Sequence, residues 1–409
     1  MKRSNSLSVV SVMALTLTAC GGGGDGGGTQ PVAAPSTGVF IDSPVQGLSY
    51  SSAPSGLSGL TGPNGEFLYR AGDRVTFSIG GYVLVGMDAS PVLGQTQVTP
   101  FIFLGNTSVP SVTHVGPVNL ARLLLALDTV PGGETITLPA TPPILPVPTN
   151  FGSAIFDTEM ANAGIPIASK ADAIVHLQKQ FAIWGSWSTA VTPNELQVIT
   201  FLPDGTFILA HDDDPLVAGG VDGMEGGTYR WNATTNELTY TIAVNTDGTG
   251  GLSHPSASQT PPYTFVIDPT GNTAVFHFGP NVSNQIVFTR VIDANNLLVG
   301  AWKVPVFESG LFPVLTFLPD GTFTVATDQA DSDPAGMERG TYVYDATTGN
   351  VTFTTTVDTN GENGVNDSPT LPAIVVVQMI VTEALGQFDF LQVQFEPNSF
   401  IHFDRVRVP

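Results

Sequence analysis

The heptapeptide FLPDGTF occurs at Phe201–Phe207 and again at Phe317–Phe323, 116 residues later. The similarity extends beyond both copies, because MEGGTY at 224–229 matches MERGTY at 337–342. Each copy also ends on the pattern I-x-F-x-R-V. Self-similarity at one fixed spacing indicates a duplicated structural unit. We therefore predict a tandem repeat of about 110 residues, with its copies at 183–293 and 297–409.

Each repeat divides into eight short segments with strand character. Leu238, Tyr240, Ile242 and Val244 alternate with Thr239, Thr241 and Ala243, which predicts a strand with one buried and one solvated face. Eight antiparallel strands joined by short turns favour an up-and-down barrel, and a two-sheet sandwich is the alternative. In the first repeat the predicted strands are 185–190, 196–202, 206–211, 227–232, 237–245, 262–267, 273–278 and 285–291.

A pattern at the two ends of each repeat resembles the lipocalin-like, or calycin, family. G-x-W lies in the first predicted strand and an arginine lies in the last. In that family the arginine stacks across the tryptophan and closes one end of the barrel, so the resemblance implies the same role here. A guanidinium over an indole gains about 1 kcal/mol or more when the pair is partly desolvated. The matching residues are Gly185, Trp187 and Arg290, and then Gly300, Trp302 and Arg405.

The heptapeptide itself is expected to be structural. Asp-Gly pairs are typical of tight hairpins, because these residues tolerate the positive φ angles that such turns use. Asp204-Gly205 and Asp320-Gly321 are therefore predicted to turn the chain between the second and third strands of each repeat.

Two further regions precede the repeats. Residues 37–112 contain strand-like runs between Gly, Pro and Asn turns, which predicts a β-sandwich-like domain. Residues 113–182 change to a helical period and form a predicted helical connector, interrupted by a proline-rich linker at Pro139–Thr149. Ser169 is a predicted N-cap. The expected buried stripes of the two helices are Leu120, Leu123, Leu124 and Leu127, and Ala173, Ile174, Leu177 and Phe181. The fold class is therefore mainly β, with a short helical connector.

Composition supports this class and limits the partners. The chain has 45 glycines and 32 prolines but only 12% charged residues, which favours many short strands over long solvated helices. Thirty-five acidic residues against 13 basic ones give a formal net charge of −22. A surface of this sign repels phosphate backbones, so we expect no nucleic-acid partner.

The N-terminus has the layout of a secretory signal. Lys2 and Arg3 precede an apolar run from Leu7 to Leu17, which is too short to span a bilayer. Residues 17–20, LTAC, resemble the lipobox of bacterial lipoproteins, in which the cysteine is lipidated and becomes the first mature residue. The resemblance implies a signal peptide at 1–19, a membrane anchor on Cys20 and, with Gly rather than Asp next, the outer membrane. An ordinary signal peptide is the alternative. Residues 20–36 are rich in Gly and Pro and predict a flexible tether.

Acidic loops are the one chemical cluster that the sequence suggests. Alternating Asp and Asn with Gly between them can supply the six to eight oxygen ligands that calcium prefers. Solvated Asx-rich turns are the alternative interpretation. No other cofactor is expected. The candidate calcium ligands are Asp212, Asp214, Asp328, Asp331, Asp333, Asp358, Asn360 and Asp367.

No sequence motif indicates catalysis. The six histidines lack the spacing of a zinc helix or finger, and the chain has neither a G-x-S-x-G elbow nor a phosphate-binding loop. We therefore expect a non-enzymatic, membrane-anchored protein outside the cytoplasm that binds a small apolar ligand or a surface partner. A structural or adhesive surface component without a small ligand is the second hypothesis, and a hydrolase assembled from distant residues is the third.

Overall fold

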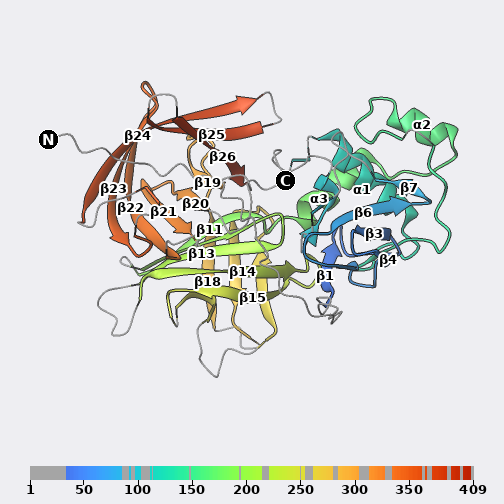
Figure 1. The fold of residues 1–409 in the computed structure, drawn as a ribbon, viewed down its shortest axis with the longest axis horizontal. Coiled ribbons are helices and arrows are strands. Elements are labelled where there is room, and N and C mark those ends of the chain that lie inside the picture. The colour runs from blue at the N-terminus through green and yellow to red at the C-terminus, as the bar shows by residue number, and fades with distance from the viewer. Residues whose placement is uncertain are drawn as a thin grey trace, which may run out of the picture. The chain divides into compact units, whose positions relative to one another are not determined.

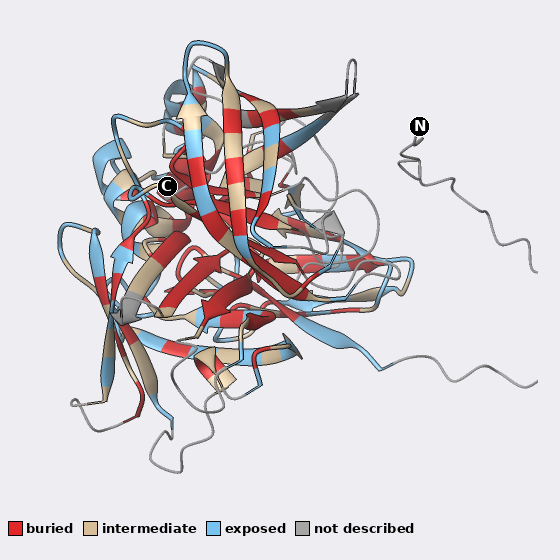
Figure 2. Ribbon diagram, turned by 90° about the vertical axis from the view of Figure 1, so that its left-hand side faces the viewer, coloured by how far each residue is buried: buried red, intermediate tan, exposed pale blue. Residues whose placement is uncertain are grey.

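The computed structural model shows a mainly β protein with two closed eight-stranded barrels, which confirms the predicted fold class (Figure 1). Buried positions gather on the strands, as the red segments in Figure 2 show. The described residues are 34–84, 92–93, 97–102, 111–112, 114–146, 149–192, 195–213, 221–248, 250–253, 261–279, 284–303, 313–327, 334–361, 364–365, 371–384, 388–396 and 399–406.

Short sheets precede the barrels and share one core. The edge-to-face ring pairs of Phe40 with Phe77 and of Phe67 with Phe77 join the two larger sheets, at centroid distances of 5.0 and 5.1 Å. The first sheet has the order β5 (Glu66–Tyr69), β1 (Ser36–Phe40), β9 (Gln97–Val98), and its β1–β9 pair is parallel. The second contains β3 (Ser49–Ala53), β4 (Leu57–Leu60), β6 (Arg74–Ile79), β7 (Tyr82–Val83) and β8 (Val92–Leu93), while β2 (Val45–Gln46) pairs with β10 (Ile136–Thr137).

Three helices connect this region to the first barrel: α1 (Val115–Leu127), α2 (Phe156–Asn162) and α3 (Lys170–Gln180). The four leucines of the α1 stripe are buried in the core of the N-terminal sheets. Ala173, Leu177 and Phe181 of the second stripe pack instead with the core of the first barrel. Ser169 caps α3, because its side chain accepts a hydrogen bond from the backbone N–H of Asp172.

Every strand of the first barrel pairs with its neighbour in the chain, and the ring closes where Trp187 of the first strand pairs with Arg290 of the last. Closure of this kind joins the two edge strands of a sheet to each other. The strands are β11 (Gly185–Thr192), β12 (Glu195–Phe201), β13 (Thr206–Asp212), β14 (Gly223–Trp231), β15 (Glu237–Asn245), β16 (Tyr263–Ile267), β17 (Thr273–His277) and β18 (Gln285–Arg290). A 3₁₀ turn at Gly251–Ser253 follows β15.

The second barrel repeats this order, and Trp302 pairs with Arg405 at its closure. Its strands are β19 (Gly300–Lys303), β20 (Val314–Phe317), β21 (Thr322–Thr327), β22 (Gly336–Asp345), β23 (Asn350–Asp358), β24 (Ala373–Ala384), β25 (Phe388–Glu396) and β26 (Ser399–Val406). The duplicated sequence therefore folds into a duplicated barrel.

The heptapeptide forms the same hairpin in both barrels. The backbone N–H of Gly205 donates to the carbonyl of Leu202, and the N–H of Leu202 donates to the carbonyl of Thr206. These two bonds define a three-residue loop in which a type I turn is followed by a glycine bulge. Gly205 and Gly321 have φ angles of 84° and 86°. Only the glycine of the Asp-Gly pair adopts positive φ; the aspartate of the first copy instead accepts bonds from the N–H and hydroxyl of Thr206.

The two barrels touch through matching surfaces. Ile208, Ala210 and Met224 of the first barrel form one buried apolar cluster with residues of the second, including Ala326 and Met337. Met224 and Met337 are equivalent positions of the repeated MEGGTY and MERGTY segments. The recurring methionines are therefore explained by contact between the barrels.

Among the described helices, none combines the length and the apolar character that crossing a bilayer requires.

Candidate functional site

The closed end of the first barrel brings Gly185, Trp187 and Arg290 together. The Cζ atom of Arg290 lies 3.9 Å from the centroid of the Trp187 ring. Its Nε, Nη1 and Nη2 atoms donate to the carbonyl oxygens of Gly271, Trp184 and Ala182 at 2.5, 2.8 and 2.6 Å. Burial lowers the pKa of Arg290 to about 10, which leaves the group charged at neutral pH. The arginine thus ties the last strand to the segment that leads into the first.

The second barrel has the same arrangement. Arg405 lies over Trp302 at 4.3 Å, and its Nη1 atom donates to the carbonyl of Val299 at 3.2 Å. Each tryptophan donates its indole N–H to a carbonyl four residues earlier, Ile183 in one barrel and Leu298 in the other. The six residues expected to close the barrels therefore occupy equivalent places in both.

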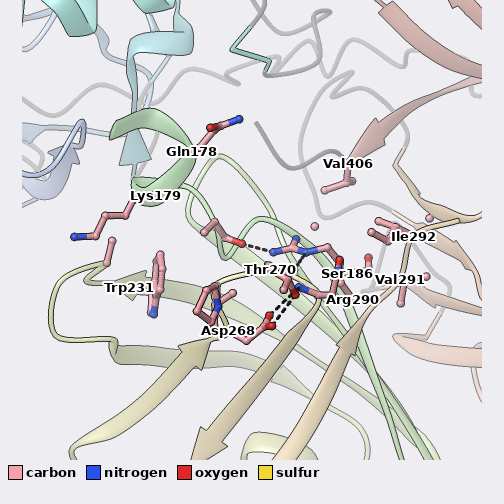
Figure 3. A pocket seen from close by; sticks show the side chains of 18 of the residues that line it. Gln178, Lys179, Ser186, Trp231, Asp268, Thr270, Arg290, Val291, Ile292 and Val406 are labelled. Atoms are coloured by element: carbon pink, nitrogen blue, oxygen red, sulfur yellow. Dashed lines mark hydrogen bonds between the residues drawn. The ribbon is translucent and has the colours of Figure 1, made fainter. Parts of the chain in front are cut away.

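A cleft of about 840 Å³ opens beside the first closure, and we call it the closure cleft. Lys179 and Trp231 lie on one side of it, with Ile292 and Val406 on the other and Arg290 between them (Figure 3). Gly300 and Arg405 of the second barrel also contribute to the lining. Apolar side chains and charged groups therefore alternate around one open space, which is the usual make-up of a ligand pocket.

The interior of the first barrel is filled by its own aromatic side chains. Phe265 makes ring contacts with Trp187, Phe201, Phe276 and Phe288, with centroid distances from 5.2 to 6.3 Å. All five of these side chains are buried. Protein interiors packed in this way leave few voids larger than a water molecule. An internal ligand would therefore have to displace several rings of this cluster.

Few of the predicted calcium ligands lie within the described residues, and those that do are engaged elsewhere. Asp212 forms an ion pair with Arg339 of the second barrel. The Oδ1 atom of Asp358 accepts bonds from the N–H groups of Asn360 and Gly361, as in an Asx turn. Asn360 is buried and donates from Nδ2 to the hydroxyl of Thr327 at 3.3 Å. Outside the described residues lie Asp214, Asp328, Asp331, Asp333 and Asp367, together with the lipidation residue Cys20.

Sequence reasoning missed a buried ionisable cluster at the other end of the first barrel. Glu225 is fully buried on β14, and its two carboxylate oxygens accept bonds from the N–H groups of Leu252 and Ser253 at 2.7 and 2.8 Å. Burial and the charge of Asp247 raise the pKa of Glu225 to about 7. Glu338 is the buried counterpart in the second barrel and accepts a bond from the N–H of Val365. Recurrence of this glutamate was visible in the sequence, but its burial was not.

Comparison with known proteins gave no family: no family model, no curated protein and no solved structure matches this chain.

Proposed function

We propose that the protein is a lipid-anchored binding protein outside the cytoplasm, held at the outer membrane by Cys20, with a small-ligand site in the closure cleft. The observation that carries this proposal is the cleft itself. Its volume of about 840 Å³ falls within the range of about 300–1,000 Å³ that is usual for small-molecule sites. The ring cluster inside the first barrel favours this external site over an internal one.

The lining indicates the class of ligand. Val175, Ile267 and Ile292 offer apolar contact, and Trp231 offers an aromatic ring. Lys179 and Asp268 supply opposite charges on the same lining. Such a surface suits a molecule with an apolar body and a polar end, because the apolar groups supply binding energy and the polar ones fix orientation. No catalytic activity is part of the proposal.

A structural or adhesive surface component is the second candidate. It is favoured by the same filled interior, because a barrel whose core is packed with its own rings needs no ligand for stability. The two candidates differ in whether a small molecule accompanies the protein.

Native mass spectrometry of the soluble Cys20→Ser variant, purified from its own host, tests the proposal. We expect a bound small molecule that is lost in Ile292→Arg, because the new side chain narrows the cleft and adds a charge. Val287→Arg is the matched control, since Val287 is 51% exposed and Ile292 is 53% exposed, and Val287 does not line the cleft. Absence of any bound molecule would favour the structural candidate. Equal retention by both variants would exclude the closure cleft as the site.

A further inference from the structure

Three side chains converge at the end of the first barrel that lies away from the closure cleft. Glu195 is the first residue of β12, His211 lies near the end of β13, and Asp213 directly follows β13. One ligand atom from each of the three lies within 4.8 Å of the others. Gly185 of the cleft pairs with Phe201, six residues along β12 from Glu195. Since a strand rises about 3.3 Å per residue, the two sites are about 20 Å apart.

His211 is buried between carboxylates without a geometrically satisfactory hydrogen bond. Its Nε2 atom lies 3.8 Å from Oε1 of Glu195, and its Nδ1 atom lies 3.4 Å from Oδ2 of Asp247. His211 is 3% exposed and Asp247 is 2% exposed, and within the described part of the chain the ring nitrogens of His211 and the carboxylate oxygens of Asp247 have no hydrogen-bond partner. Burying such groups unsatisfied is costly, which indicates that something else satisfies them.

We propose that Glu195, His211 and Asp213 bind a divalent transition-metal ion, and that Asp247 orients His211. One imidazole nitrogen with two carboxylate oxygens suits zinc, manganese or iron, whereas calcium takes oxygen ligands. A carboxylate beside the ring nitrogen that faces away from the metal is the usual outer support of a metal-binding histidine. Asp247 occupies this position, beside Nδ1 of His211. Three protein ligands leave a coordination position for water or an external ligand.

The second barrel carries different residues at the two buried positions of this cluster. Thr327 is the counterpart of His211 and Asn360 is the counterpart of Asp247, and these two side chains form a neutral hydrogen bond of 3.3 Å. Glu195 and Asp213 correspond in sequence to Leu311 and Gln329. The buried pair of the cluster, His211 and Asp247, is thus replaced together, although the hairpin and Glu225 are retained. Joint replacement is what the loss or gain of one shared function would produce.

A proton competes with the metal ion for His211. Burial lowers the pKa of His211, but the close approach of Asp247 and the charges of Asp247, Asp213 and Glu195 outweigh it, and the net shift is upward. An imidazolium between carboxylates would satisfy the cluster as a buried ion pair. Because a metal needs the neutral imidazole, metal and proton compete at this histidine. The experiment therefore has to detect the metal directly.

The test is titration of zinc and of cobalt into the full chain after chelation, followed by calorimetry and by the visible absorption of cobalt. We expect one ion per chain, and a fall in affinity of at least about 100-fold in His211→Gln. His277→Gln is the matched control, because His277 lies in the same barrel on β17 and outside the cluster. Asp247→Asn should weaken zinc binding about 10- to 100-fold, which is the usual effect of changing a residue that orients a metal ligand.

If His211→Gln does not fold, Glu195→Gln and Asp213→Asn test the same site. Both residues are only partly buried, so we expect both variants to fold. Each should reduce zinc affinity by at least about tenfold and alter the cobalt spectrum. Absence of binding to the chelated wild-type chain, or equal affinity in wild type and a folded ligand variant, would overturn the proposal. His211 would then be the centre of a metal-free ion pair. Neither result depends on the closure cleft.

Discussion

Arg290 and Arg405 show how one side chain closes a barrel. Each guanidinium lies over the indole of the first strand and donates to carbonyls of the segment that precedes that strand. This contact between arginine and tryptophan matters because few residue pairs join the first and last strands. In the first barrel these pairs are Trp187 with Arg290 and Ser188 with Thr289. The arginine adds contacts across a closure that is otherwise short.

Arg290→Ala should therefore lower the free energy of unfolding by about 3 kcal/mol or more. The change removes three hydrogen bonds from a charged donor, leaves the buried carbonyl of Trp184 without this donor and removes the cation–π contact. Arg230→Ala is the control, because Arg230 is exposed on β14, and it should change stability by less than about 0.5 kcal/mol. Urea denaturation measures both. Equal stability of the two variants would contradict a closing role for Arg290.

Glu225 should make stability depend on pH. Its folded-state pKa of about 7 exceeds the ordinary value of 4.5, because burial and Asp247 disfavour its charge. The folded state therefore holds more protons than the unfolded chain between these values, and stability falls as pH rises from about 4.5 to about 7. The loss is about 3 kcal/mol at most. Tyr240 is a further titratable neighbour, and burial, followed by the charges of Tyr263 and Glu225, raises its pKa well above the ordinary value of 10 and outside this window.

Glu225→Gln should flatten this pH dependence in denaturation of the metal-free chain. Glu237→Gln is the control, since Glu237 is an exposed glutamate on the adjacent strand β15. We expect the Glu237→Gln profile to run parallel to that of the wild type. If the profile of Glu225→Gln also runs parallel, the glutamate does not titrate in this range and the account of its burial is wrong.

At the scale of elements, the repeated hairpin is explained by backbone geometry. Gly321 has a φ of 86°, and the nearest atom to an added Cβ is a carbonyl oxygen at 3.8 Å, which is ordinary contact. Strain from the left-handed conformation, rather than a clash, is therefore what a side chain would suffer here. Gly205 in the first barrel has a φ of 84°, so a side chain there would suffer the same conformational strain.

Gly321→Val should lower the free energy of unfolding by about 1–3 kcal/mol. Thr341→Val is the control, because it places the same side chain at an exposed position of the neighbouring strand β22 and should be nearly neutral. Thermal unfolding compares the two. An unchanged melting temperature in Gly321→Val, with loss of binding to a partner, would mark the heptapeptide as a recognition element instead.

Sequence pattern predicted most of these elements. The prediction for strand β15 matches its full length of 237–245, because large apolar residues occupy every second position between its ends. Strand β14 was expected from 227 but begins at Gly223, since a run of glycines resembles a turn. The strand has a β-bulge between Gly226 and Gly227. A Cβ added to Gly227 would lie 1.9 Å from the carbonyl oxygen of Thr241, so this position requires glycine. Close backbone approach of this kind cannot be read from composition.

The candidate sites were less predictable for a physical reason. His211 and Asp247 are 36 residues apart and meet only because β13, β14 and β15 are adjacent in one sheet. The closure cleft likewise depends on where α3, β18 and the second barrel meet. The sequence did contain one usable signal: His211 and Asp247 become Thr327 and Asn360 in the second copy. Comparison of the copies position by position would have selected that pair.

At the scale of the whole molecule, the two barrels have the same strand order but different chemistry. The second retains the hairpin, the closing arginine and the buried glutamate, and carries Thr327 and Asn360 at the positions of His211 and Asp247. Features required for folding therefore recur, whereas the buried histidine and aspartate do not. We infer that the second barrel serves mainly as a structural partner, joined to the first through the Met224 and Met337 surface.

Cys20→Ser should release the protein from the membrane. The chain has one cysteine, and it is the residue that the lipobox resemblance assigns to lipidation. A lipid anchor supplies about 0.8 kcal/mol per buried methylene, so its loss removes the main membrane affinity. Fractionation with mass spectrometry of the N-terminal peptide measures this. Recovery of the variant in the membrane fraction with an unchanged acyl mass would refute the lipoprotein assignment.

The central claim is that the first barrel is a packed scaffold and that a small ligand binds outside it. The most direct measurement is a crystal structure of the Cys20→Ser variant, purified from its host with its bound molecule. We predict ligand density in the closure cleft, against Trp231 and Ile292, with Phe265 and its neighbouring rings still filling the first barrel. Ligand density inside the first barrel, with those rings displaced, would contradict the account.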